Sequence, residues 1–280
     1  MANSAYVATA LAPSRPAPPG IARVWTGTRV AGTLLCALWV ALAGAMIWYF
    51  VAGYESDFVG KYAPRLLNGL WLTIWITLVS IGLGLLLAGL LTAMRLSSSA
   101  LLRGPAAGFM AFFRGTPLIA QVFLIYYGTG QFSDALKAVN LWWFFREALY
   151  CAVLAFTLNT AAYQAQIYIG AIRDVPKGQR EAAMTLGLRP GVVFWKIVLP
   201  QAAITALRPL GNEIVLMVKG SAIASVITVL DLMGETRLAY SRTFDFQIYL
   251  WAACLYLVLV EVLRRVWDVL EARLTRHLKR

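Results

Sequence analysis

Long apolar segments recur along this chain, and they constrain its fold more than any other feature. A helix needs about 20 apolar residues to cross a bilayer. Hydrophobic residues make up 60% of the 280 residues and charged residues only 14%, which is more apolar surface than a soluble domain of this length needs. The chain is therefore expected to be an all-α polytopic membrane protein. Six segments are predicted to span the membrane: 31–52, 69–94, 105–128, 148–170, 203–227 and 247–264.

The first of these segments follows a tail, residues 1–30, whose first twenty residues are rich in proline and look disordered. Its apolar stretch exceeds 20 residues, so residues 31–52 are predicted to be a retained membrane anchor rather than a signal peptide. Ala43-Gly44-Ala45 leaves cleavage as the alternative.

Lysine and arginine are distributed unequally between the loops. With the N-terminus inside the cell, sixteen of them flank the membrane on the cytoplasmic side and six on the opposite side. The positive-inside rule then predicts a bacterial inner membrane protein with both termini and residues 171–200 in the cytoplasm. Because the net charge of +12 is spread over membrane-flanking loops, it does not indicate a nucleic-acid partner.

Catalytic signatures are missing from the sequence. No G-x-x-x-x-G-K-[ST] phosphate-binding loop occurs, so the chain is not expected to hydrolyse ATP itself. Cys36, Cys151 and Cys254 lie in apolar segments without metal-ligand spacing, and His277 is the only histidine. We therefore expect neither catalytic residues nor metal ligands, and the chain is not expected to be an enzyme.

A polar island separates the fourth and fifth apolar segments. It reads Glu181-Ala182-Ala183, three residues, Gly187, nine residues, and then Ile197-Val198-Leu199-Pro200. Residues 179–186 are predicted to form a short helix after a break at Lys177-Gly178, with Glu181 in its first turn and Gly187 as its stop.

The small side chains of this island suit a contact surface. Ala182 and Ala183 would let a partner approach the backbone closely, and Arg180, Glu181 and Arg189 would fix its orientation at the rim. An ordinary solvated loop helix is the alternative.

This residue order resembles the EAA loop, E-A-A-x3-G-x9-I-x-L-P, of binding-protein-dependent ABC importer permeases, without a gap or a substitution. The resemblance implies that a coupling helix docks on a cytoplasmic ATPase dimer, which binds ATP and Mg, so that this chain needs no cofactor. It also implies a periplasmic or surface amino-acid-binding protein as a partner. The ATPase-coupling residues that it implies are Glu181, Ala182, Ala183, Gly187 and Arg189.

A second resemblance covers residues 65–265. Asn68-Gly69-Leu70-Trp71-Leu72-Thr73, Phe113-Arg114-Gly115-Thr116-Pro117-Leu118 and Gly211-Asn212-Glu213 are similar to permeases for polar amino acids, and Leu141-Trp142-Trp143 to the M-type subunit of histidine, basic amino acid and opine uptake systems. This implies the type I ABC importer permease fold, with a five-helix core plus the extra helix at 31–52. It also implies a second permease subunit, either a related Q-type chain or a second copy.

Two apolar segments carry polar residues that such a permease could place along a substrate pathway. Gly115 and Pro117 are expected to bend or interrupt the third segment near its start beside Arg114, although an interfacial arginine is the alternative. Asn159, Tyr163 and Gln166 share one helical face of the fourth segment and are expected to turn inward, as pathway residues or as contacts between helices.

The fifth segment adds charges at membrane depth. Arg208, Asn212 and Lys219 fall on one helical face, and such groups normally face the bundle, a cavity or a partner. Glu213 is offset by one position, and its pairing with a basic residue is the alternative to a gating role. Gly220-Ser221-Ala222 is predicted to interrupt the helix. The candidate pathway residues are Arg114, Asn159, Tyr163, Gln166, Asn212 and Lys219.

Residues 266–280 combine leucines and Val266 at four-residue spacing with a cluster of arginines and lysines. This pattern predicts a basic amphipathic tail on anionic membrane lipid, and simple continuation of the last span is the alternative. For the whole chain, a transporter without an ATPase and a membrane scaffold without a pathway remain the competing hypotheses, which copurification of an ATPase would separate from an importer.

Overall fold

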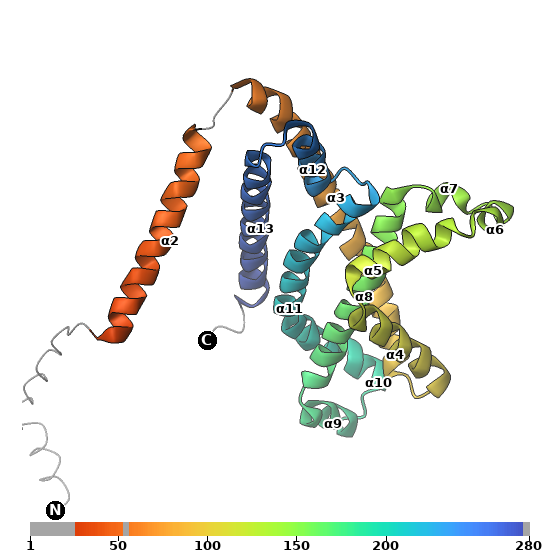
Figure 1. The fold of residues 1–280 in the computed structure, drawn as a ribbon. Helices are drawn as coiled ribbons and strands as arrows, with labels where there is room; N and C mark the ends of the chain where they lie inside the picture. Colours follow the sequence, from red (N-terminus) through yellow and green to blue (C-terminus); the bar gives the residue numbers. More distant parts are fainter. Residues whose placement is uncertain (1–25, 53–55, 277–280) are drawn as a thin grey trace, which may run out of the picture. The chain divides into compact units, whose positions relative to one another are not determined.

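The structure, a computed structural model, describes residues 26–52 and 56–276, and every regular element in those ranges is a helix. The chain divides into two units at Tyr54 and Glu55. The first contains α2 (Gly27–Ala52). The second contains α3 (Ser56–Leu96), α4 (Ala100–Gly115), α5 (Leu118–Phe123), η1 (Leu124–Gly128), α6 (Ser133–Ala138), α7 (Trp142–Phe145), α8 (Ala148–Asp174), α9 (Lys177–Thr185), α10 (Pro190–Val193), η2 (Phe194–Val198), α11 (Leu199–Gly220), η3 (Ser221–Ile227), α12 (Leu232–Thr243) and α13 (Gln247–Leu274) (Figure 1).

Helix α2 includes the whole segment predicted as an N-terminal anchor. Its stretch Gly27–Tyr49 is long and apolar enough to cross a membrane. Its apolar side chains, Trp39 and Trp48 among them, suit a lipid environment. The predicted tail lies outside the described residues up to position 25.

Four single helices of the described chain are long and apolar enough to span a membrane, and a bent pair makes a fifth. Helix α8 corresponds to the fourth predicted span, 148–170, but it falls outside this set. It lies at the centre of the second unit against α3, α4, α5 and α11 (Figure 1). Because its neighbours shield it, α8 carries Asn159, Thr160 and Gln164 in buried positions, and these residues reduce its hydropathy.

Small residues let helix α8 approach its neighbours closely. Ala152, Ala155, Ala161 and Ala162 are fully buried along it. On α3, a Cβ added to Gly84 would lie 2.6 Å from the Thr160 methyl group. Since lipid tails provide little hydrophobic drive for helices to associate, such close packing is a main source of stability in this bundle.

The predicted interruption of the third span is confirmed. Helices α4 and α5 are bent by 110° at a break containing Thr116 and Pro117. Thr116 has an extended backbone, as proline demands of the residue before it, and Pro117 supplies no N–H to continue α4. The break lies in the middle of the predicted segment 105–128 rather than near its start.

The end of the fifth span differs from the prediction. At Gly220 the α-helix is not interrupted but tightens into the 3-10 helix η3, which ends at Thr228 in a left-handed conformation. Helix α12, which the apolar pattern did not reveal, then begins with Asp231 as its N-cap, whose carboxylate accepts a hydrogen bond from the Gly234 N–H at 2.9 Å.

The C-terminal segment continues the last span, which was the alternative to a separate amphipathic tail on the membrane surface. Helix α13 runs unbroken from Gln247 to Leu274 and includes most of the predicted amphipathic tail. Trp267 Nε1 donates to the Leu207 carbonyl oxygen at 2.9 Å, and Arg208 Nε lies 2.6 Å from Glu271 Oε1. This end of α13 is therefore packed on α11. Residues 277–280, including Leu278, lie outside the described part.

Candidate functional site

Helix α9 of the polar island begins at a proline cap and ends at a glycine. Pro176 is its N-cap and Lys177 its first residue, so the predicted break at Lys177-Gly178 is wrong and Glu181 lies beyond the first turn. At the other end Gly187 has φ +75°, its N–H donates to the Met184 carbonyl at 2.9 Å, and the Leu188 N–H donates to the Ala183 carbonyl at 3.2 Å. This is a Schellman motif, which confirms Gly187 as the helix stop.

One side of α9 is fixed to the bundle. Ala183 is only 3% exposed and packs in a cluster with Val175, Val193, Val198 and Ala202, which come from the ends of α8 and α11 and from the segment between them. The Ala183 side chain is therefore not on the outer surface where a partner was expected to meet it. Arg180 is also half-buried rather than at a rim, because its guanidinium donates to the Ile172 carbonyl.

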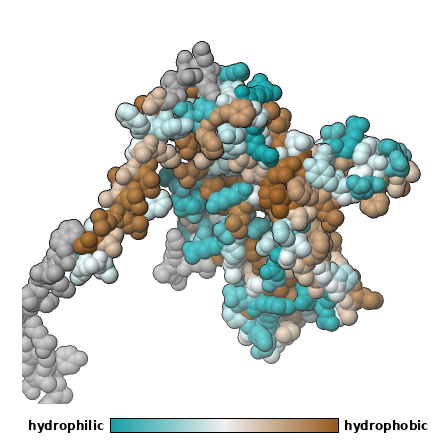
Figure 2. All heavy atoms as spheres, viewed as in Figure 1, coloured by the Kyte–Doolittle hydropathy of each residue, from teal (hydrophilic) through white to brown (hydrophobic). Residues whose placement is uncertain are grey.

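The other side of α9 is open. We call Glu181, Ala182, Leu186, Gly187 and Arg189 the α9 surface, since all five are exposed and lie on α9 or directly after it. Leu186 is 81% exposed, an apolar residue that the sequence interpretation had not singled out. No ion pair involves Glu181 or Arg189 within the described ranges. Figure 2 shows hydrophilic residues gathered at this end of the second unit. The surface thus offers an apolar centre with unpaired charges around it.

The break between α4 and α5 is closed by amide side chains. Gln121 Nε2 lies 2.9 Å from the Phe113 carbonyl oxygen and 3.1 Å from that of Thr116. Asn159 Nδ2 donates to the same Phe113 carbonyl at 3.0 Å and to Gln121 Oε1 at 2.9 Å. These donors replace the helical N–H groups that the bend removes, as a broken helix at membrane depth requires. Asn159 therefore holds α8 to the break. Gln121 had not been predicted.

Three candidate pathway residues meet just beyond this amide pair. Arg114 Nη1 donates to Gln166 Oε1 at 3.1 Å, and the Arg114 guanidinium lies 5.7 Å from the centroid of the Tyr163 ring. All three side chains are exposed in the isolated chain, whereas Asn159 is buried. The stripe expected to turn inward is therefore divided: Asn159 faces the core, while Tyr163 and Gln166 form with Arg114 an open polar patch, which we call the Arg114 patch.

The remaining pathway candidates lie apart from this patch. Asn212 and Lys219 are exposed on α11, and no hydrogen bond joins either to the Arg114 patch in the part of the chain that is described. Glu213 points inward, where its carboxylate accepts a hydrogen bond from the Thr160 hydroxyl at 3.0 Å. No ion pair involves Glu213 among the described residues, so the predicted pairing with a basic residue is not found.

Comparison with known proteins places these features in one family. Residues 80–276 match the family described as the binding-protein-dependent transport system inner membrane component. The nopaline transport system permease protein NocM of Agrobacterium fabrum is 36% identical over 217 residues, 77% of this chain and 90% of NocM. The octopine transport system permease protein OccM of Rhizobium meliloti is 39% identical over 219 residues, 78% of this chain and 89% of OccM. The arginine ABC transporter permease protein ArtM of Escherichia coli K12 is 35% identical over 213 residues, 76% of this chain and 96% of ArtM.

Solved structures agree with the sequence comparison. A crystal structure of an amino acid ABC transporter with histidines superposes with a TM-score of 0.70 at 32% identity, covering 79% of this chain and all of that one. The inward-facing MetNI methionine ABC transporter shares the fold with a TM-score of 0.63 at 21% identity, over 79% of this chain and all of that one. The predicted type I importer permease fold is thereby confirmed, and the chain belongs to the inner membrane components of binding-protein-dependent transport systems.

Proposed function

We propose that this chain is the permease subunit of an ATP-driven importer for a polar or basic amino acid or an opine, and that residues 171–200 couple it to a cytoplasmic ATPase dimer. The observation that carries the proposal is the α9 surface, an exposed helix whose opposite side is fixed to the bundle through Ala183. The amino acid, opine and arginine permeases among its relatives support the substrate class.

The packing of α9 explains how such coupling would work. The Ala183 cluster joins α9 to the ends of α8 and α11, the helices at the centre of the bundle. Closely packed interiors move as units rather than deform continuously. A partner that displaces the α9 surface would therefore displace α8 and α11 with it. ATP and Mg would be bound by the partner ATPase, and this chain would supply only the docking surface and the moving helices.

The proposed orientation places the α9 surface and both termini in the cytoplasm, as the sixteen-to-six distribution of basic residues favours. An amino-acid-binding protein would then deliver substrate on the opposite face. We infer a second permease subunit, a Q-type relative or another copy, because the Arg114 patch is open in the isolated chain. Charged groups at membrane depth need a cavity or a partner to face.

The Arg114 patch is the proposed contribution of this subunit to the substrate pathway. Arg114 supplies positive charge suited to the carboxylate that every amino acid carries, while Gln166 and Tyr163 offer hydrogen bonds. No acid belongs to the patch. The counter-charge for a cationic side chain would therefore come from the second permease or from the binding protein. Asn212 and Lys219 on α11 would belong to the same pathway only if the second permease bridges them to the Arg114 patch.

The test is copurification and coupling in the assembled transporter. A cytoplasmic ATPase should copurify with the parent chain, and the loaded binding protein should stimulate its hydrolysis of ATP. Glu181→Lys should weaken ATPase association and uptake while membrane insertion is preserved. Asp268→Lys, which reverses an exposed acid on α13 on the same side of the membrane, is the matched control and should leave both unchanged. Normal uptake by Glu181→Lys would contradict the coupling role.

A further inference from the structure

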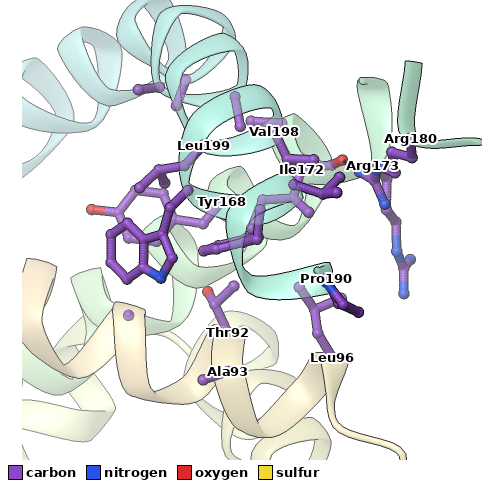
Figure 3. Close-up of a pocket in the computed structure, with 18 of the residues that line it drawn as sticks. Thr92, Ala93, Leu96, Tyr168, Ile172, Arg173, Arg180, Pro190, Val198 and Leu199 are labelled. Carbon is purple, nitrogen blue, oxygen red and sulfur yellow. Dashed lines mark hydrogen bonds between the residues drawn. The ribbon is translucent and has the colours of Figure 1, made fainter. Parts of the chain in front are cut away.

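A cavity of about 1170 Å³ lies between α9 and the membrane-spanning helices (Figure 3). Its walls come from the end of α3, the end of α8, the segment from α9 to η2, and the start of α11. This volume exceeds the roughly 300–1,000 Å³ of an ordinary small-molecule pocket. It separates the coupling helix from the bundle on one side, while Ala183 joins them on the other.

The cavity wall is almost wholly apolar. Alanine, leucine, valine and aromatic side chains make up most of it. Among its few polar groups, the Thr92 hydroxyl is already engaged with the Ala165 carbonyl at 3.4 Å. A free amino acid, with its ammonium and carboxylate groups, would find too few partners on this wall to offset its desolvation. The chemistry of the wall instead fits a hydrocarbon chain.

Positive charge gathers at one edge of the cavity. Figure 3 shows Arg173 and Arg180 on the same side of it. Arg173 is exposed, and no ion pair involves it within the described residues. Arg180 is held by the Ile172 carbonyl and adds a second positive charge nearby. An apolar wall with a cationic edge is complementary to an anionic amphiphile.

The position of the cavity indicates which amphiphile it meets. It lies where α3 and α8 end, α11 begins and the polar island joins them, and such a change from apolar span to polar loop marks the expected boundary between bilayer and water. Trp195 lines it and is 65% exposed, and tryptophan is enriched at the level of lipid headgroups. Phospholipids of the adjacent leaflet are thus the most concentrated hydrocarbon chains within reach.

We propose that this cavity binds an acyl chain of an anionic phospholipid from the leaflet on the α9 side, with Arg173 beside the net negative charge of its headgroup. The lipid fills the space between the coupling helix and the bundle, so it supports the position of α9. Removal of anionic lipid should therefore loosen coupling. The binding itself follows from the membrane fold and does not depend on the identity of the transported substrate.

Quenching of Trp195 by brominated lipid tests the proposal. The assembled transporter is placed in nanodiscs that contain either brominated phosphatidylglycerol or brominated phosphatidylcholine at equal mole fraction. The Trp195 signal is taken as the difference between the parent and Trp195→Phe. We expect phosphatidylglycerol to quench Trp195 at least severalfold more strongly than phosphatidylcholine. Equal quenching by the two lipids would overturn the recognition of charge.

Two variant pairs locate the binding site. Arg173→Gln should remove the preference for phosphatidylglycerol, whereas Arg103→Gln, an exposed arginine that does not line the cavity, should preserve it. Ala203→Phe fills the cavity and should reduce quenching by both lipids. Ala111→Phe, an exposed alanine on α4, is its control. Unchanged quenching in Ala203→Phe would show that the chain lies outside the cavity. Uptake is measured in a separate experiment, so the quenching result would still test lipid binding if the proposed transport function proved wrong.

Discussion

The α9 surface and the Arg114 patch carry their functional residues in different ways. On α9 the exposed residues are neighbours in sequence, and one short helix with a glycine stop presents them together. In the Arg114 patch, the arginine and Gln166 are separated by 52 positions and meet because α4 packs against α8. The first region is built from local geometry and the second from packing between helices. Changes to α9 should therefore alter coupling, and changes around the break should alter the bundle as well.

The largest effect is expected from the two adjacent alanines of α9. Ala183→Asp places a charge in an apolar cluster, and burying this unpaired group costs roughly several kcal/mol of stability. Helix α9 should detach from the bundle, and uptake should be lost. Ala182→Asp adds the same charge on the exposed side and should leave α9 attached. Limited proteolysis of residues 171–200 distinguishes them, and equal cleavage of both variants would refute the two-sided description of α9.

The amide pair at the break should show its role in stability. Asn159→Leu leaves Gln121 Oε1 without its donor, and an orphaned buried group costs about 1–3 kcal/mol. The thermal midpoint of the purified transporter should fall. Gln121→Leu should destabilise it similarly, and the double variant should lose less than the sum of the two, because the residues share partners. Strict additivity would mean that the two amides act independently.

The role of Gly187 as the helix stop can be tested by making the same glycine-to-alanine substitution at each end of α9. Gly187→Ala forces a side chain into a left-handed conformation and should destabilise the turn by about 1 kcal/mol. Gly178→Ala lies within the helix, in open space, and should stabilise α9 by up to about 1 kcal/mol. Uptake and protease resistance of residues 171–200 should move in opposite directions in the two variants. Movement in the same direction would contradict the assignment of Gly187.

The smallest effect is expected in the Arg114 patch. Gln166→Ala removes one exposed hydrogen bond to Arg114 and should raise the KM for uptake roughly fivefold, corresponding to about 1 kcal/mol. Gln166→Glu should raise it further, because the new carboxylate would pair with Arg114 and compete with the carboxylate of the substrate. Gln164→Ala, on the buried side of α8, serves as a control for helix packing. If Gln166→Glu transports like the parent, the patch is not on the pathway.

The sequence predicted features that depend on local chemistry. Apolar length located the spans, and Gly187 and Pro117 marked a helix stop and a break through their backbone preferences. The start of α9 was misplaced because Pro176 was not recognised as its N-cap. Helix α12 was missed because its polar sequence carries no membrane signal.

Features that depend on packing could not be predicted in the same way. Ala182 and Ala183 are chemically identical, and only the positions of α8 and α11 bury one of them. Gln121 is a single amide in an apolar segment, and its role requires knowledge of the bend that brings it to Phe113. The burial of Asn159 and the exposure of Gln166 on one helix likewise reflect which neighbours surround each position.

The contact between Trp267 and Gly211 has a consequence for biogenesis. A Cβ added at Gly211 would lie 2.2 Å from Trp267 Nε1, so the indole occupies the space that a side chain would need. Helices α3 to α11 leave the ribosome long before Trp267 does. The Leu207 carbonyl therefore gains the indole as a donor only after α13 is synthesised and inserted. The docking of α13 on α11 is thus a late step, and the space beside Gly211 stays unfilled in every chain arrested before Trp267.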